Sequence, residues 1–305
     1  MIRRAAPALL LAGLLPGVAA CSGGSAADGD PATPSPSTSS STPSTSSETP
    51  SEPAATPTLD PPPVGPQYVA LGDSYAAAPG VPQTSGADGC FRSSSNYAQL
   101  VARKTGLTVT DVTCSGATTE SVLLTQVPEI TAEAELVTVG IGGNDFDLFT
   151  RLISGCVGAA QADPEGSPCS DDLSAEVRDT LPKISDNVGR VLDAVTAAAP
   201  QARVVVVGYP VLLPATGTCP DRIPLATGDY PLVNEVTRGL SAALRTQADR
   251  LGLDFLDLSG PSRGHDVCSA EPWINGAEVA PDGTIPFHPF GIEQQAVARR
   301  IAAFL

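Results

Sequence analysis

Basic and aromatic residues are scarce in this 305-residue chain, and each scarcity narrows what the protein can do. It has 17 Lys and Arg against 33 Asp and Glu, a formal net charge of -16 at pH 7. A surface that binds nucleic acid needs clustered positive charge, so we expect no nucleic-acid partner. Aromatic residues make up 4% of the chain, and the two histidines are His265 and His288. Few side chains can therefore act as a base near neutral pH.

The N-terminus carries a short apolar segment. Two arginines precede an apolar stretch over residues 5–15, and small residues then lead to Cys21. This order is typical of an export signal, and the stretch is too short for a membrane-spanning helix. The run Val-Ala-Ala-Cys that ends at Cys21 resembles the bacterial lipobox, which implies cleavage before Cys21 and a lipid on its sulfur. The alternative is an ordinary secretory signal in which Cys21 is incidental.

A compositional change divides the rest of the chain. Residues 22–63 are almost wholly Ser, Thr, Pro, Ala and Gly, and such a segment cannot bury a core. We therefore predict a signal peptide over residues 1–20, a disordered Ser/Thr/Pro-rich stalk over 21–65 and a catalytic domain over 66–305. The last segment has about 240 residues, enough for one well-buried domain.

Apart from Cys21, the sequence has six cysteines, an even number that favours three disulfides in an exported protein. A structural zinc site would need close pairs such as C-x-x-C, and none occurs, so we expect no metal site. Several pairings are open. We favour the sequential one, because each bond then closes a local loop: Cys90–Cys114, Cys156–Cys169 and Cys219–Cys268.

Strand-like and helix-like patterns alternate along the predicted domain. Apolar residues recur at helical spacing over residues 173–195, 232–251 and 292–305. This alternation predicts an α/β fold with a parallel sheet covered on both faces, in which ligands bind beyond the carboxyl ends of the strands. Five short apolar or β-branched runs predict the strands: residues 68–71, 107–113, 136–141, 204–207 and 255–256.

Candidate reactive groups follow the predicted strands. Ser74 comes directly after the first strand, where a tight turn into a helix would expose its hydroxyl as a nucleophile; the alternative is a plain turn or helix cap. Gly116 follows the second strand and Asn144 the third, and their N–H groups could hold an oxyanion. Each could also be an ordinary loop residue. Near the C-terminus His288 is a candidate base, and His265 is the other.

Four short blocks stand in a fixed order: Gly-Asp-Ser-Tyr at 72–75, Gly116, Gly-Gly-Asn-Asp at 142–145 and His-Pro at 288–289. Together they resemble the blocks of the SGNH hydrolases, also called the GDSL family. The resemblance extends from about residue 68 to residue 305. Within the family the chain is most similar to secreted lipases and esterases of Streptomyces type. The resemblance implies a three-layer, flavodoxin-like α/β/α sandwich with a parallel five-stranded sheet.

The resemblance also implies roles for individual residues. Ser74 would be the nucleophile and His288 the base, with His265 a structural or pocket-edge residue. The Ser74 N–H, the Gly116 N–H and the Asn144 amide would form the oxyanion hole. Many family members have an Asp three residues before the histidine, where this chain has Ile285. We therefore expect the Ile285 backbone carbonyl to orient His288, and Asp282 is the rival.

These expectations define a function. The chain is predicted to be a serine esterase or lipase, a carboxylic-ester hydrolase at the cell envelope, held to the membrane through Cys21 and active as a monomer without metal or organic cofactor. Its partner would be an acyl ester, with loops 76–92 and 154–170 shaping the acyl pocket. Two alternatives are an O-acetylesterase of envelope polysaccharide and a non-catalytic ligand-binding lipoprotein. Against the latter, Ser74 and His288 are both intact.

Overall fold

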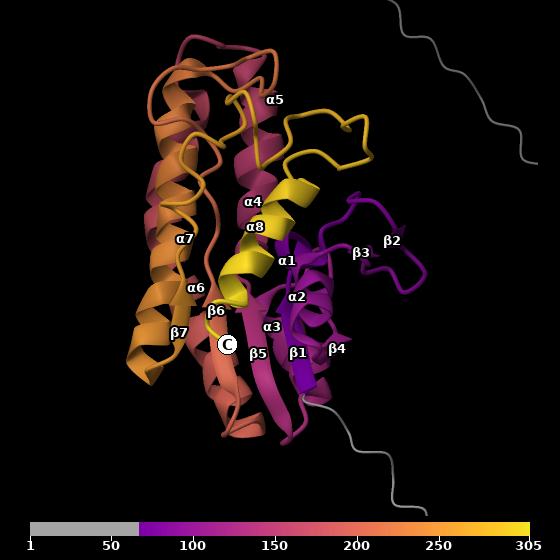
Figure 1. Cartoon of the computed structure of the whole chain (residues 1–305). Helices are drawn as coiled ribbons and strands as arrows, with labels where there is room; N and C mark the ends of the chain where they lie inside the picture. The colour runs from indigo at the N-terminus through magenta and orange to yellow at the C-terminus, as the bar shows by residue number, and fades with distance from the viewer. Residues whose placement is uncertain (1–66) are drawn as a thin grey trace, which may run out of the picture. The chain divides into compact units, whose positions relative to one another are not determined.

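The computed structural model describes residues 67–305. Its centre is a five-stranded parallel sheet in the order β4-β1-β5-β6-β7 (Figure 1). This confirms the predicted five-stranded parallel sheet. The strands are β1 (Gln67–Gly72), β4 (Thr108–Asp111), β5 (Ala134–Gly140), β6 (Arg203–Val207) and β7 (Asp254–Leu256). A small antiparallel hairpin, β2 (Thr84–Ser85) with β3 (Arg92–Ser93), projects beside it.

Helices follow the strands along the chain. The longer ones are α2 (Tyr97–Thr105), α6 (Pro168–Ala198), α7 (Tyr230–Leu251) and α8 (Gly291–Ile301). Shorter α-helical turns are α1 (Ser74–Ala77), α3 (Thr119–Ser121), α4 (Leu148–Thr150) and α5 (Cys156–Ala160). Turns of π or 3-10 type are Val122–Gln126, Val127–Glu129, Asp145–Asp147, Arg151–Gly155 and Thr227–Asp229.

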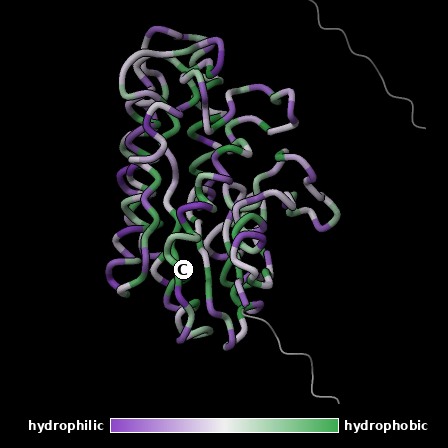
Figure 2. Tube along the Cα trace, in the orientation of Figure 1, coloured by the Kyte–Doolittle hydropathy of each residue, from purple (hydrophilic) through white to green (hydrophobic). Residues whose placement is uncertain are grey.

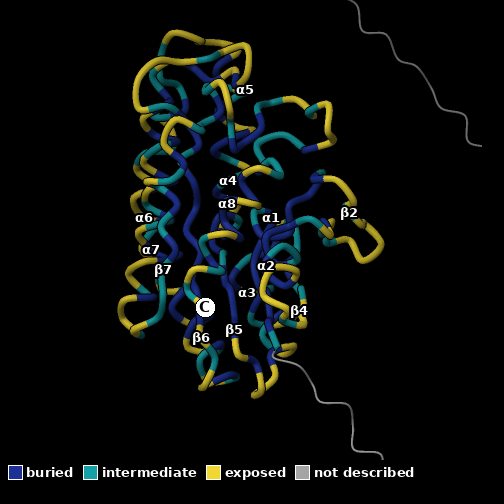
Figure 3. Tube along the Cα trace, viewed as in Figure 1, coloured by how far each residue is buried: buried dark blue, intermediate teal, exposed yellow. Residues whose placement is uncertain are grey.

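The side chains of each strand alternate between the two faces of the sheet, and this alternation produces two separate core layers. Successive side chains of a strand point to opposite faces, so Val69 and Leu71 of β1 join one core cluster, and Tyr68 and Ala70 join another. The first cluster packs under α6 and α7, and the second under α2 and α8. Figure 2 shows the strands as apolar, and Figure 3 shows them buried. The result is the predicted three-layer sandwich.

The predicted element ends need correction at two places. The run 107–113 forms a strand only over Thr108–Asp111, an edge strand with partly exposed side chains. The pattern 292–305 forms a helix only over Gly291–Ile301. Val297 and Ile301 are buried, as expected, but Ile292 is 46% and Leu305 57% exposed. Ile292 lies in the first turn of α8 on its solvent side, so it is not part of the buried stripe.

Three disulfides tie the loops, and they are the sequential pairs Cys90–Cys114, Cys156–Cys169 and Cys219–Cys268. Cys156–Cys169 links α5 to the first turn of α6. The predicted segments 1–20 and 21–65, with Cys21, lie outside the described residues. Within residues 67–305, no helix combines the length and the apolar character needed to cross a membrane.

Candidate active site

Ser74 lies at the carboxyl end of the central strand β1. It is the first residue of α1, and Asp73 caps that turn by accepting the Tyr75 N–H at 2.9 Å. The preceding residue, Gly72, has φ of 150°, and an added Cβ there would come within 2.6 Å of the Gly140 carbonyl oxygen. Only glycine therefore lets β1 turn this closely beside β5. The turn places the Ser74 hydroxyl at the predicted end of the sheet.

Asn144 follows β5, next to the Ser74 turn. Its side-chain amide donates to the Ala117 carbonyl at 2.9 Å, and an amide has a second N–H that remains for a ligand. Gly143 before it donates its N–H to the Tyr209 hydroxyl at 3.0 Å. A Cβ on Gly143 would lie 2.2 Å from the Phe149 ring, so a larger residue would push that ring away. Asn144 is thus held from both sides in a fixed direction.

Gly116 lies in the loop after β4. It has φ of 79°, a conformation that favours glycine, and it is exposed. The Cys90–Cys114 disulfide tethers this loop, and the next residue, Ala117, accepts the Asn144 amide bond. Gly116 does not itself line the cavity that holds Ser74. Its part in an oxyanion hole therefore remains a prediction.

One cavity of about 250 Å³ brings three of the predicted residues together, namely Ser74, Asn144 and His288. Apolar side chains form most of its wall: Phe149, Ile153, Leu212, Leu213, Ile223, Val233, Val267 and Ile274. Of the two loops expected to shape the pocket, 76–92 contributes no lining residue and 154–170 contributes Ser154. The wall comes instead from the turns after β5, the segments after β6 and β7, and the start of α7.

The His288 ring is oriented by a main-chain carbonyl. Its Nδ1 lies 2.7 Å from the Pro286 oxygen, and because a carbonyl can only accept, Nδ1 carries the proton. The neutral ring then has Nε2 free as a proton acceptor. Burial lowers the pKa of His288 from its usual value, and the bond to Pro286 offsets part of that shift. The resting imidazole is therefore neutral at neutral pH.

Both candidates for the His288 orienter were misplaced. The Ile285 carbonyl accepts from the Asn275 side-chain amide at 3.2 Å, and the Asp282 carboxylate accepts the Thr284 N–H at 3.0 Å. The physical reason lies at Phe287, whose φ of 60° is left-handed. This turn between Pro286 and His288 folds the Pro286 carbonyl back toward the ring. The prediction of a main-chain carbonyl was right in kind and wrong by one residue.

Tyr75 supports that turn from the other side of the site. Its hydroxyl donates to the Phe287 carbonyl at 2.9 Å, and its ring centroid lies 5.9 Å from that of His288. The Gln294 side-chain amide in α8 donates to the Tyr75 carbonyl at 2.9 Å. Sequence reasoning missed this function. The only available signal was the position of Tyr75 directly after Ser74.

A buried network joins the ends of β1, β5 and β6. The Tyr209 hydroxyl donates to the Asp73 carboxylate and accepts the Gly143 N–H. Burial raises the pKa of Asp73 to about 6, although its bonds from Tyr209 and Tyr75 act in the opposite direction. This network holds the Ser74 turn and the Asn144 turn in fixed register. Tyr209 was also missed, because it follows β6 without any reactive motif.

His265 lies away from Ser74. Its ring stacks on Trp273 with centroids 4.9 Å apart, and its Nδ1 is 2.8 Å from the Glu271 carbonyl oxygen. It is not among the residues that line the Ser74 cavity. Over residues 67–305, no group of three or more His, Cys, Asp and Glu side chains is placed to hold a metal ion.

Similarity to known proteins agrees with this geometry. The model of the GDSL-like Lipase/Acylhydrolase family matches residues 70–289. The chain is 36% identical to Lipase 2 of Streptomyces coelicolor over 253 residues, covering 76% of this chain and 83% of that lipase. It is 31% identical over 227 residues to a lipase of Streptomyces rimosus, covering 73% and 80%.

Solved structures show the same relationship. Phospholipase A1 from Streptomyces albidoflavus superposes with a TM-score of 0.69 at 27% identity, covering 79% of this chain and 98% of that one. The extracellular lipase of Streptomyces rimosus gives a TM-score of 0.67 at 27% identity, covering 78% and 99%. Sheet order, the Ser74 turn and these matches lead to one conclusion: the chain belongs to the GDSL-like lipase/acylhydrolase family.

Proposed function

We propose that this ester hydrolase uses Ser74 as nucleophile and His288 as general base in a two-residue catalytic unit. The observation that supports this most directly is that both residues line one cavity while the Pro286 carbonyl holds the His288 Nδ1 proton. Nε2 is then left as the proton acceptor of the ring. Within residues 67–305 no hydrogen bond joins the Ser74 hydroxyl to the ring; such bonds are often long before substrate binds.

The reaction is acyl transfer in two halves. His288 Nε2 takes the Ser74 proton as the oxygen attacks the ester carbonyl carbon. The C–O bond to the alcohol breaks, and the imidazolium gives its proton to the departing alcohol. Water, deprotonated by the same Nε2, then attacks the acyl-enzyme and releases the acid, so that Ser74 recovers its proton. The chemistry needs no electron transfer and no co-reactant besides water.

Three N–H groups are proposed to stabilise the oxyanion, those of Ser74, Gly116 and the Asn144 side chain. Asn144 has the best support, because its amide is fixed by Ala117 at the wall of the cavity. Preorganised donors of this kind stabilise the charge that develops in the transition state and need no reorganisation.

The cavity wall favours an acyl ester with an apolar chain. Eight of its lining residues are the apolar side chains named above. Relatives carry the names lipase, esterase and phospholipase A1. These observations do not favour the polysaccharide O-acetylesterase alternative. The non-catalytic alternative would leave the fixed orientation of His288 without a purpose.

We infer that the protein is exported. Support comes from the signal-like N-terminus, the three disulfides and the extracellular lipase of Streptomyces rimosus among its relatives. Lipidation of Cys21 and a monomeric state stay predictions. If Cys21 is lipidated, the wild type fractionates with membranes and Cys21→Ser releases it. Wild type found wholly in the medium would contradict the anchor.

A graded set of p-nitrophenyl esters, from acetate to palmitate, tests the proposed function with chelator present. We expect hydrolysis of several chain lengths, loss of activity in Ser74→Ala and covalent labelling of Ser74 by a serine-directed phosphonate. Ser154→Ala is a matched control, because Ser154 lines the same cavity without a proposed role in the chemistry. Phosphonate labelling of another residue would refute the assignment of the nucleophile.

A further inference from the structure

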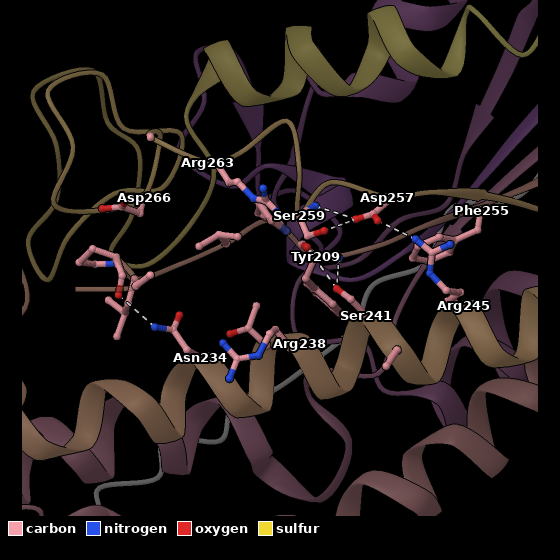
Figure 4. Close-up of a pocket in the computed structure, with 18 residues that line it drawn as sticks. Tyr209, Asn234, Arg238, Ser241, Arg245, Phe255, Asp257, Ser259, Arg263 and Asp266 are labelled. Carbon is pink, nitrogen blue, oxygen red and sulfur yellow. Dashed lines mark hydrogen bonds and ion pairs between the residues drawn. The ribbon is translucent and has the colours of Figure 1, made fainter.

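A second cavity, of about 600 Å³, lies outside the site that holds Ser74. Its walls come from the middle of α7 (residues 234–245), the segment 209–215 after β6 and the segment 255–266 around and after β7 (Figure 4). Leu213 borders both cavities, so one stretch of chain separates them. The proposed ester hydrolysis does not use this larger space.

The charge of this cavity differs from that of the chain as a whole. Acidic residues outnumber basic ones by 33 to 17 in the sequence. In the cavity, three arginines stand against two aspartates: Arg238, Arg245 and Arg263 against Asp257 and Asp266. The cavity is therefore a locally basic place on an acidic protein, where an anion is attracted.

Two of the three arginines are available to a ligand. Arg245 is paired with Asp257 at 2.6 Å, so these charges are already balanced. Asp266 accepts the Cys268 N–H at 3.0 Å. Over residues 67–305, no ion pair or side-chain hydrogen bond engages the guanidinium groups of Arg238 and Arg263, and both side chains are exposed. In Figure 4, Arg238 projects from α7 and Arg263 from the loop across the cavity.

The polar groups beneath the arginines are mostly satisfied. The Ser241 hydroxyl accepts the Tyr209 N–H at 3.1 Å and donates to the Tyr209 carbonyl at 3.2 Å. Asn234 donates to the Pro214 carbonyl at 3.1 Å. Beside them lie partly exposed apolar side chains, among them Val211 and Phe255. A ligand that enters here meets apolar surface below two cationic groups.

We propose that this cavity binds an anionic amphiphile, with its phosphate or carboxylate head between Arg238 and Arg263 and its apolar part along Val211 and Phe255. A guanidinium presents paired N–H donors that match the oxygens of such a head. Burial of the apolar chain against the apolar wall strengthens binding, and an anion without such a chain does not gain this contribution. The proposal is independent of the roles of Ser74 and His288, because none of its residues belongs to the proposed chemistry.

Calorimetric titration with four soluble probes tests the binding. The probes are octyl phosphate, octanoate, inorganic phosphate and octyl glucoside, each used below its micelle concentration. We expect one site for the octyl anions. Octyl glucoside, which has no charge, and inorganic phosphate, which has no chain, bind at least about tenfold more weakly. Binding of octyl phosphate alone indicates a phosphate-bearing lipid, and binding of octanoate alone indicates a fatty acid.

Variants locate the site. Arg238→Gln and Arg263→Gln are each expected to weaken octyl-anion binding by about tenfold or more, since each removes a charged hydrogen-bond donor. Arg299→Gln, an exposed change on α8 with the same loss of charge, stays within about twofold because its charge is distant and screened by salt. Hydrolysis of p-nitrophenyl esters is measured in all three proteins and is expected to match the wild type.

Three results would overturn the proposal. An equal loss of binding in Arg299→Gln would mean that only net charge matters. Unchanged binding in both cavity variants would place the ligand elsewhere. Complete loss of binding after phosphonate labelling of the catalytic serine, with both arginine variants binding normally, would place the amphiphile in the smaller cavity. Because binding and hydrolysis are read separately, failure here leaves the proposed ester hydrolysis untouched.

Discussion

The Ser74 turn and the loop that carries His288 differ in what fixes their conformation. The first is set by neighbours in the sequence and by the adjacent strand: Gly72 permits the close turn beside Gly140, and Asp73 caps the helix start. The second, residues 282–288, contains no regular element. It is held by Tyr75, far away in the sequence, and by Asn275 and Gly276 of the preceding segment. One half of the candidate site is therefore a local structure, and the other is assembled by tertiary contacts.

We expect the largest loss of activity from substitution of Ser74 and His288, the residues that these two regions carry. Ser74→Ala and His288→Ala should each reduce kcat by ten-thousandfold or more, on the order of the losses in serine proteases. Because the two residues act as a unit, the double variant should be no worse than either single one. Steady-state kinetics on one p-nitrophenyl ester measures this, with circular dichroism as the control for folding. Additive losses would show that the two residues act independently.

Substitution of Asn144 should have the second largest effect on activity. Asn144 belongs to the part of the site that is fixed by local structure. Asn144→Ala removes an oxyanion donor and should lower kcat by about a hundredfold to a thousandfold with KM little changed. Asn144→Asp is the sharper companion, because it keeps the size and places a negative charge beside the oxyanion. We expect it to be at least as damaging as alanine. A change confined to KM would indicate a role in ground-state binding alone.

The pH dependence of hydrolysis tests the part of the candidate site that the loop 282–288 carries, namely His288. Only neutral His288 can accept the Ser74 proton, and burial lowers its pKa, so kcat/KM should reach half its plateau below about pH 6.5. Below that pKa, activity falls about tenfold per pH unit. Asp73, with a pKa near 6, titrates in the same window. Asp73→Asn is the control, and its profile should keep the acidic limb. A midpoint well above that of free histidine would point to a carboxylate partner.

Local patterns in the sequence were enough to predict the sheet and the placement of Ser74 and Asn144. The sequential disulfide pairing was a preference among several open ones, and the structure has it. Strand alternation and strand-end glycines depend on residues close in sequence, so a pattern can reveal them. The Pro286 carbonyl could not be identified in this way. Its direction follows from the left-handed Phe287, and that conformation is supported by Tyr75, about two hundred residues away in the chain. The apolar cavity wall was missed for the same reason, since its residues come from four separate segments.

Tyr75 links the Ser74 turn to the loop that carries His288, and Tyr75→Phe should have a moderate effect on kcat. It removes the hydroxyl bond to the Phe287 carbonyl but keeps the ring beside His288. A single neutral hydrogen bond contributes about 0.5 to 1.5 kcal/mol, so we expect kcat to fall by about two- to twelvefold. If Tyr75 positions the histidine, the midpoint of the pH profile shifts with it. Tyr97→Phe is the matched control, because the buried Tyr97 hydroxyl has no hydrogen-bond partner within residues 67–305.

Asp282→Asn should have the smallest effect on turnover. A small effect would argue against Asp282 as the acid of a catalytic triad. The Asp282 carboxylate caps the Thr284 N–H at 3.0 Å, and an asparagine oxygen can accept the same bond. Neither the loop nor the Pro286 carbonyl should move, so turnover stays within about tenfold of the wild type, whereas disabling a triad aspartate costs on the order of ten-thousandfold. Steady-state turnover and thermal unfolding are measured together. A folded Asp282→Asn protein with the larger loss would mean that the loop rearranges when substrate binds and brings a carboxylate to His288. In that case the His288 loop would complete the site only in the complex, while the Ser74 turn is complete before substrate arrives.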